Sequence, residues 1–294
     1  MKTFVSKLTI FVVMAVILNL DTVSAGQITM TLKEKGKIKI RMAGSGTASI
    51  NWGDGITSEI KTLSKELSTY SHVYTENIVR TVTIISDNIT GFNCKNIQLI
   101  NLDVSKNTVL ELLVCLNNQL VSLDVSNNTL LNLLDCGRNL LTNLDVSLNT
   151  ELNELYCNEN QLTNLDVNKN TKLTGLWCFD NKLTNLDVSK NTMLTVLWCF
   201  KNELTSLDVS RNTALTMLWC AENRLTSLDL SNNIVLQILN CGYNQLSLSA
   251  YDDLFSTLHN NHNIRKRKIY MYGNSEIKIN KNHVAVKNGW KVKN

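Results

Sequence analysis

The chain has 294 residues, 44% of them hydrophobic and 6% aromatic, and a formal net charge of +4. That length can bury the core of one or two domains, and so small a charge gives no reason to expect nucleic-acid binding. A mean hydropathy of -0.06 excludes a bundle of membrane helices, and the absence of proline argues against long disordered linkers.

Residues 1–25 have the order of charged and apolar residues that is typical of a secretory signal peptide. Lys2 and Lys7 precede an apolar run from Leu8 to Leu20, and small residues lie at the end of the segment, before Gly26. The apolar run is shorter than the ~20 residues that cross a bilayer. The sequence therefore predicts export and cleavage before Gly26. The expected location is secreted or cell-surface, with the periplasm as an alternative, and no membrane span is expected after cleavage.

Residues 26–88 do not repeat and are predicted to form a small β domain. Apolar and β-branched residues alternate at 29–32, 37–41, 48–52 and 79–85, between glycine, asparagine and serine. The motifs Asn51-Trp52-Gly53-Asp54-Gly55 and His72-Val73-Tyr74 resemble those of the PKD-like β-sandwich family, although the phenylalanine of that family's W-x-F-G-D-G turn is missing. The resemblance implies a spacer or cap, with Trp52 in its core.

From residue 89 to 248 the chain is periodic. Every cysteine lies 21 residues after the previous one: Cys94, Cys115, Cys136, Cys157, Cys178, Cys199, Cys220 and Cys241. One unit reads L-x-x-L-x-C-x-x-N-x, followed by L-x-x-L-D-V-S-x-N-T-x. This pattern resembles the leucine-rich-repeat signature, in the nested 21-residue form of secreted and surface bacterial proteins. The resemblance implies a mainly β solenoid of eight repeats with short parallel strands.

The cysteines are predicted to form a buried thiol ladder. Alternation along a strand such as Leu176-Trp177-Cys178 turns leucine and cysteine inward and tryptophan outward. Strands stack about 4.8 Å apart, which is wider than the Cβ separation that a disulfide prefers. Disulfide pairing, which is common in exported proteins, remains the alternative. No histidine lies in the repeats to complete a zinc site, so no metal site is expected.

The same alternation predicts an apolar surface on the middle and late repeats. Its members are the residues that precede or follow the cysteine, or lie three residues before it: Tyr156, Trp177, Phe179, Val196, Trp198, Phe200, Met217 and Trp219. Contiguous apolar surface usually marks an interaction site, and aromatic residues are preferred anchors. Two structural interpretations stay open: the rings stabilise one another across strands, or another part of the chain covers them.

A second column of residues, Asp103 and its equivalents up to Asp229, brings carboxylates close together. Basic residues three positions later, and hydroxyl donors in the turns, are expected to relieve their repulsion. Calcium is the alternative, but the glycine-rich nonapeptide of calcium-binding β-rolls is missing. A hydrogen-bonded structural column without metal is therefore expected.

Residues 249–294 are predicted to cap the solenoid with a short helix and strand. Ser249 is placed to N-cap the helix, with Asp252 and Asp253 near its positive end. Residues 268–274 are expected to form one more strand.

The four histidines lie outside the repeats, the cysteines are expected to be buried, and no catalytic residues are identified. The sequence therefore predicts an exported binding protein without enzymatic activity or a cofactor. Its aromatic surface would bind a protein partner in adhesion or recognition. A glycan ligand that stacks on the tryptophans, or a purely structural envelope role, remains an alternative.

Overall fold

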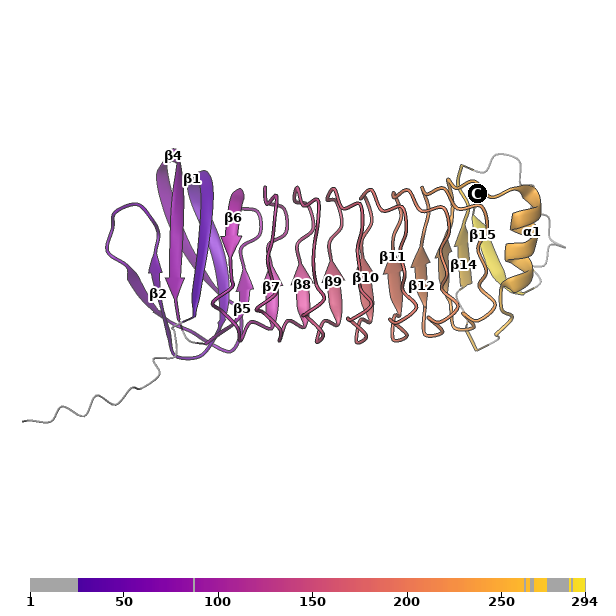
Figure 1. The fold of residues 1–294 in the computed structure, drawn as a ribbon, viewed down its shortest axis with the longest axis horizontal. Helices are drawn as coiled ribbons and strands as arrows, with labels where there is room; N and C mark the ends of the chain where they lie inside the picture. Colours follow the sequence, from indigo (N-terminus) through magenta and orange to yellow (C-terminus); the bar gives the residue numbers. More distant parts are fainter. Residues whose placement is uncertain are drawn as a thin grey trace, which may run out of the picture.

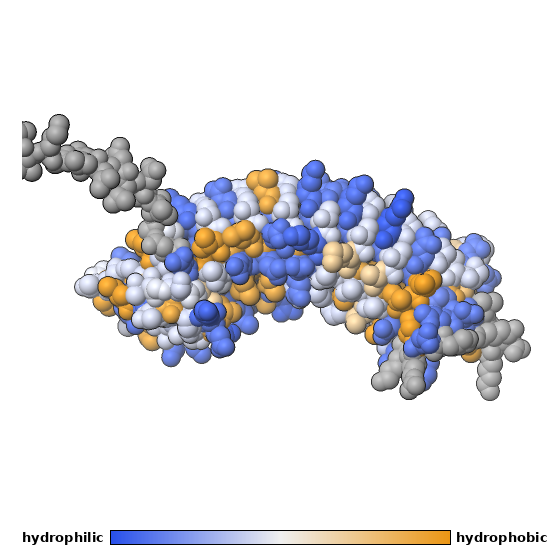
Figure 2. Space-filling model, turned by 90° about the horizontal axis from the view of Figure 1, so that it is seen from below, coloured by the Kyte–Doolittle hydropathy of each residue, from blue (hydrophilic) through white to orange (hydrophobic). Residues whose placement is uncertain are grey.

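A computed structural model describes residues 26–86, 88–261, 263–264, 267–273, 286 and 288–293. The predicted signal peptide lies outside the described residues. The coils of the chain stack into an elongated β-solenoid, with antiparallel strands at one end and helix α1 at the other (Figure 1). A view along the strands shows that the stack is bent into an arc (Figure 2).

The N-terminal end is built from strands β1 (Gln27–Gly44), β2 (Thr47–Asn51), β3 (Glu59–Thr62) and β4 (Ser68–Ile85), all paired antiparallel. The two separate strands expected at 29–32 and 37–41 are one strand. A β-bulge between Glu34 and Gly36 absorbs the irregular residues without ending the pairing with β4. Gly36 has a φ of 100°, which glycine adopts readily.

The N-terminal strands and the solenoid share one sheet. Strand β1 pairs antiparallel with β5 (Ile89–Asn93) and with β6 (Leu99–Asp103), and β5 in turn pairs parallel with β7. Residue 88 therefore lies between the antiparallel strands and β5, the first strand of the parallel stack. The sheet is continuous from one part to the other. Trp52 is 3% exposed, as expected of a core residue, and the PKD-like resemblance stays a prediction.

Each later coil adds one parallel strand of three residues. These strands are β7 (Leu112–Val114), β8 (Leu133–Asp135), β9 (Glu154–Tyr156), β10 (Gly175–Trp177), β11 (Val196–Trp198), β12 (Met217–Trp219) and β13 (Ile238–Asn240). Neighbouring strands pair in a register that places equivalent repeat positions side by side. The predicted leucine-rich-repeat solenoid is confirmed.

The interior consists of columns of identical residues. The middle leucine of each strand and the cysteine that follows it are both fully buried, as Leu176 and Cys178 illustrate. Asparagine side chains join the coils: Asn139 donates to the carbonyls of Cys115 and Cys136 and accepts from the Leu120 amide at 3.0 Å. These bonds satisfy backbone groups in the turns, where the short strands leave them unpaired.

The C-terminal end closes the last coil with α1 (Leu248–Thr257), β14 (Arg267–Tyr270) and β15 (Trp290–Lys293). The predicted N-cap is wrong by two residues, because the Ser247 hydroxyl accepts from the Ala250 amide and Ser249 already lies in the first turn. Strands β14 and β15 extend the parallel sheet beyond β13. Among the described residues, no helix has the length and apolarity that crossing a membrane requires.

Candidate functional site

The eight predicted site residues lie together on the solvent-facing side of strands β9 to β12. We call them the aromatic patch: Tyr156, Trp177, Phe179, Val196, Trp198, Phe200, Met217 and Trp219. Register pairs Tyr156 with Trp177, Trp177 with Trp198, and Trp198 with Trp219, so these rings form one row across four strands. All eight side chains are half-buried, since each covers part of its neighbour.

The rings are arranged as stacked pairs. The Tyr156 and Trp177 rings have centroids 4.0 Å apart and planes 8° apart, and those of Trp198 and Trp219 are 4.6 Å and 12° apart. Phe179 and Phe200 form a third pair at 4.4 Å. Between the first two pairs the rings of Trp177 and Trp198 meet at 72°, with centroids 6.3 Å apart. The patch is thus a stepped surface.

Gly175 causes this step. A Cβ at residue 175 would overlap the outer carbons of the Trp177 ring, which therefore occupies the space above the glycine. The equivalent residue of the next coil is Val196, whose side chain fills that space. The Trp198 ring packs instead beside Phe179, with centroids 6.2 Å apart.

Polar groups bound the patch on one side. The Tyr156 hydroxyl donates to a Glu154 carboxylate oxygen at 2.7 Å, and burial, followed by this acceptor, raises the pKa of Tyr156. In the same row, next to Tyr156, lies Asp135, whose carboxylate accepts from the Gly137 amide at 3.2 Å. Burial raises the pKa of Asp135 despite this hydrogen bond and the nearby Lys95. The aromatic row therefore ends against a carboxyl group that is costly to ionise.

Two indole N–H groups in the patch lack hydrogen-bond partners. The Nε1 atoms of Trp198 and Trp219 are buried among the rings and have no acceptor in the part of the chain that the structure describes. A buried donor without an acceptor typically costs about 1–3 kcal/mol. Cross-strand stacking stabilises the patch, and the cost of these two unpaired N–H groups offsets part of that stabilisation.

The cysteines are separated from this surface by the sheet itself. All eight are free and fully buried, which confirms the predicted thiol ladder. Burial raises the pKa of Cys178 and of Cys220 to about 12. Thiols in this state are poor nucleophiles and poor metal ligands.

The aspartate column is hydrogen-bonded, as predicted. Each carboxylate accepts from the amide two residues later; Asp124, for example, accepts from Ser126 at 2.9 Å. Side-chain and backbone bonds from Ser126 hold the pKa of Asp124 below its usual value. Within the described ranges, no group of three or more histidine, cysteine or acidic residues is placed to hold a metal ion.

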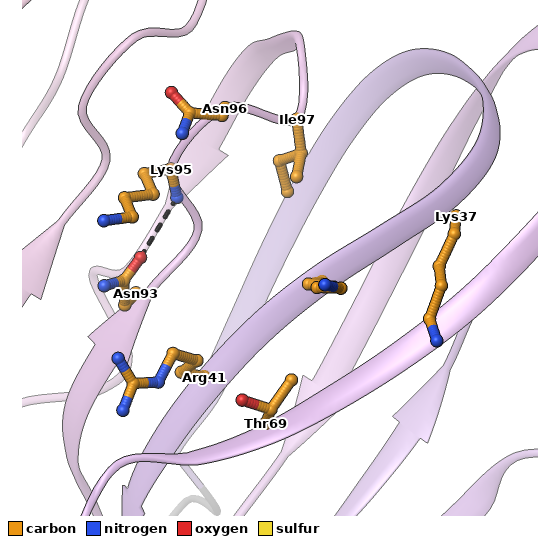
Figure 3. Close-up of a pocket in the computed structure, with 8 residues that line it drawn as sticks. Lys37, Arg41, Thr69, Asn93, Lys95, Asn96 and Ile97 are labelled. Carbon is orange, nitrogen blue, oxygen red and sulfur yellow. Dashed lines mark hydrogen bonds between the residues drawn. The ribbon is translucent and has the colours of Figure 1, made fainter.

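Sequence reasoning missed a basic pocket at the N-terminal end of the solenoid. A cavity of about 350 Å³ is lined by four cationic side chains from β1 and from the turn after β5: Lys37, Lys39, Arg41 and Lys95 (Figure 3). The alternation of cationic residues with buried Ile38 and Ile40 signals an exposed face in the sequence. The approach of Lys95 depends on the pairing of β1 with β5, which the sequence does not reveal.

An apolar groove adjoins the first coils. Leu112, Leu130 and Leu133 line a cavity of about 460 Å³, together with Glu111 and Glu151. In Figure 2, apolar side chains gather near the N-terminal strands and again near the C-terminal end of the stack. The acidic residues Asp135 and Glu154 lie between this groove and the aromatic patch, so the two apolar surfaces are separate.

Comparison with known proteins shows what this architecture is similar to. No protein-family model matches the chain, and no curated protein matches it. Among solved structures, the functional domain of InlJ from Listeria monocytogenes, described as including a cysteine ladder, is 39% identical with a TM-score of 0.59. The match covers 67% of this chain and 42% of that chain.

Two further structures are similar in fold. A leucine-rich-repeat protein of Leptospira interrogans is 21% identical, with a TM-score of 0.54 and coverage of 64% of this chain and 49% of that one. Internalin C2 of Listeria monocytogenes is 20% identical, with a TM-score of 0.51 and coverage of 56% and 77%. This chain spans less than half the length of InlJ's functional domain and of the Leptospira protein. The structural neighbours of this leucine-rich-repeat solenoid thus include bacterial internalin-type proteins.

Proposed function

We propose that the protein is an exported binding protein without enzymatic activity, whose aromatic patch holds a protein partner in adhesion or cell-surface recognition. The observation that carries this proposal is the patch itself: eight half-buried apolar side chains on one face of a sheet that the interior columns hold rigid. Large aromatic residues on a preorganised surface are the usual anchors of protein interfaces.

The unpartnered indole groups support a role beyond stability. The buried Nε1 atoms of Trp198 and Trp219 have no acceptor among the described residues, and this lowers the free energy of unfolding. If the two side chains served only to stabilise the sheet, a hydrogen-bond acceptor or an aliphatic residue in their place would make the protein more stable. Their retention is understandable if the ring surface is needed for contact. The likeness to an internalin-type fold agrees with a binding scaffold, and the proposed export depends on the sequence of residues 1–25.

The ring geometry favours a protein over a glycan. A sugar binds a tryptophan by stacking on the face of the ring, and in two pairs of the patch those faces lie against each other at 4.0 Å and 4.6 Å. The polar group nearest Tyr156, the Glu154 carboxylate, already accepts the tyrosine hydroxyl. Ring edges and the stepped apolar surface remain available, and these suit apolar side chains of a partner.

The proposal is tested with fluorescent mature protein, residues 26–294, added to a panel of intact cells and measured by flow cytometry. The variant Trp177→Ala/Trp198→Ala/Trp219→Ala should lose binding, because the anchors are gone. The control variant Val121→Ala/Leu148→Ala/Met193→Ala changes three exposed apolar residues outside the strands and should bind as the wild type does. Circular dichroism verifies that both variants are folded.

Treatment of the cells separates the partner classes. Protease digestion of the cell surface should abolish binding, whereas enzymatic removal of glycans should leave it. Equal binding by the wild type and the folded tryptophan variant would overturn the assignment of the patch. Loss of binding after deglycosylation alone would make the ligand a glycan.

A further inference from the structure

We propose that the basic pocket is a binding site for a short acidic peptide segment, and that this segment belongs to the partner held by the aromatic patch. The second half of this inference rests on the proposed function, whereas the first half stands on the pocket alone. The basic pocket is formed by Lys37, Lys39, Arg41 and Lys95 around a cavity of about 350 Å³.

The position of the cations follows from strand alternation. Residues 37, 39 and 41 of β1 face outward because Ile38, Ile40 and Met42 fill the core. Residues of like orientation along a strand lie about 6.8 Å apart, which is also the repeat of alternate side chains in an extended peptide. Lys95 is carried to the same cavity by the turn after β5, whose Asn93 pairs with Arg41.

The charges of the pocket are not balanced by the protein. Among the described residues, none of the four cations takes part in an ion pair. The partners of residues 37, 39 and 41 on β4 are the uncharged Val73, Ser71 and Thr69. Arg41 donates to the Leu67 carbonyl at 3.0 Å, which holds the guanidinium in place without neutralising it.

Two carboxyl groups lie at the margins of the pocket. Glu34 lines the adjoining cavity, and Asn96 is common to both. Asp135 lies on the patch side, where the charge of Lys95 acts to lower its pKa, against the larger effect of burial. Four clustered cations thus face two peripheral acids, and the excess positive charge favours an anionic ligand.

The pocket and the aromatic patch lie in one row of the sheet. Register links Arg41 to Asn93, and then through Val114 and Asp135 to Tyr156. The strands β5 and β9 are three steps apart, or about 14 Å. A standard protein interface extends over some 20–30 residues on each side, so one partner can cover both sites. The patch would supply the apolar centre of that interface and the pocket its charged margin.

The basic surface is small, and its extent favours a short acidic segment over a long polyanion. A long polyanion needs a continuous track of cations, but the row from Arg41 reaches the apolar Val114 and then Asp135. Further negative charge at Asp135 would be repelled. A few carboxylates on a peptide fit the cavity and can end before that point, while apolar side chains continue over the patch.

The pocket is tested with a hexaglutamate peptide, titrated into the folded protein at low ionic strength and followed by fluorescence anisotropy. The variant Lys37→Gln/Lys39→Gln/Lys95→Gln should weaken binding about tenfold, because three of the four cationic charges are lost and screening by salt is weak at low ionic strength. The control Lys169→Gln/Lys182→Gln/Lys190→Gln changes net charge equally with exposed lysines of the repeats, and should stay within about twofold of the wild type. Added salt should weaken wild-type binding.

The comparison of variants gives decisive outcomes. Equal weakening in both lysine variants, or no measurable binding of hexaglutamate by the wild type, would overturn the site. Binding of a sulfated oligosaccharide that depends on Lys37, Lys39 and Lys95, without binding of hexaglutamate, would replace the peptide by a glycan. The folded tryptophan variant should bind hexaglutamate as the wild type does, so a failed aromatic patch and a failed pocket give different results.

The link to the partner is tested in the cell-binding assay. The lysine pocket variant should bind cells more slowly and with less dependence on salt than the wild type, whereas the control lysine variant should not differ. If the pocket variant binds cells as the wild type does, at every salt concentration, the acidic segment is not part of that partner.

Discussion

Inward and outward columns of the same strands follow opposite rules. The inward position after each strand holds cysteine in all eight repeats, whereas the neighbouring outward position changes from coil to coil: Asn93, Val114, Asp135, Tyr156, Trp177, Trp198, Trp219 and Asn240. The interior must fit a fixed space between identical neighbours, and only one residue type serves throughout. The outward column is free of that constraint. Its residues can therefore vary from coil to coil, and its aromatic members form the patch for which we propose a function.

The largest expected difference between the columns is chemical accessibility. Alkylation of the cysteines in the native protein at pH 8 should be at least about a thousandfold slower than in denaturant, because the thiols are buried and their pKa values are raised. Mass spectrometry should count eight modified thiols after unfolding and none before. Rapid labelling of the native protein, or fewer than eight free thiols in denaturant, would show that the inward column is not a buried ladder of free thiols.

Stability should distinguish adjacent residues of one strand. Leu197→Ala should lower the free energy of unfolding by about 3 kcal/mol, because it leaves a cavity between packed coils. Trp198→Ala should cost less, about 1.5 kcal/mol, since its ring is only half-buried and an unpartnered N–H is removed with it. Urea denaturation measures both. If the tryptophan variant were the less stable, the outward rings would be part of the scaffold.

Asp135 and Asp124, from two different columns, should contribute to the pH dependence of stability with opposite signs. Burial raises the pKa of Asp135, so the folded state disfavours its ionisation, and the protein loses stability as pH rises through that pKa. Asp135→Asn should therefore stabilise the protein at pH 7 and have no effect at pH 3. Hydrogen bonds lower the pKa of the exposed Asp124, whose contribution is present at pH 7 and lost as pH falls through its folded pKa.

Asp124→Asn serves as the matched variant in this experiment. It should slightly destabilise the protein at pH 7, and this destabilisation should shrink as pH falls through the folded-state pKa of Asp124, which lies below its usual value. Thermal unfolding at both pH values separates the two variants. A loss of stability at neutral pH in Asp135→Asn would mean that its hydrogen bond from Gly137 outweighs its burial.

The smallest expected effect on stability sharpens the description of the patch. Gly175→Ala should displace the Trp177 ring, because the new Cβ would overlap it, while the inward leucine and cysteine stay in place. Stability should change by less than about 1 kcal/mol. Near-ultraviolet circular dichroism should report the loss of the stack on Tyr156. An unaltered spectrum would show that the ring has room that the geometry does not reveal.

Much of the fold could be predicted because one rule is repeated eight times. The 21-residue period fixes the coil, and alternation decides that Cys178 points inward and Trp177 outward. The exceptions arise where the chain does not repeat. The bulge at Gly36 joins two expected strands, and the choice of Ser247 over Ser249 as N-cap depends on local geometry. The outward placement of the residues of the proposed site could be predicted, but the orientation of their rings could not, because the missing side chain at Gly175 decides it.

Because the coil repeats, the length of the solenoid can change in steps of one coil. The deletion of one whole unit between the basic pocket and the aromatic patch, such as residues 116–136, would preserve every interior column, because the cut ends are equivalent positions of adjacent coils. It would bring the two surfaces closer by one strand, about 4.8 Å. A chain that gains or loses units in this way can match partners of different dimensions in fixed increments, with no redesign of its core.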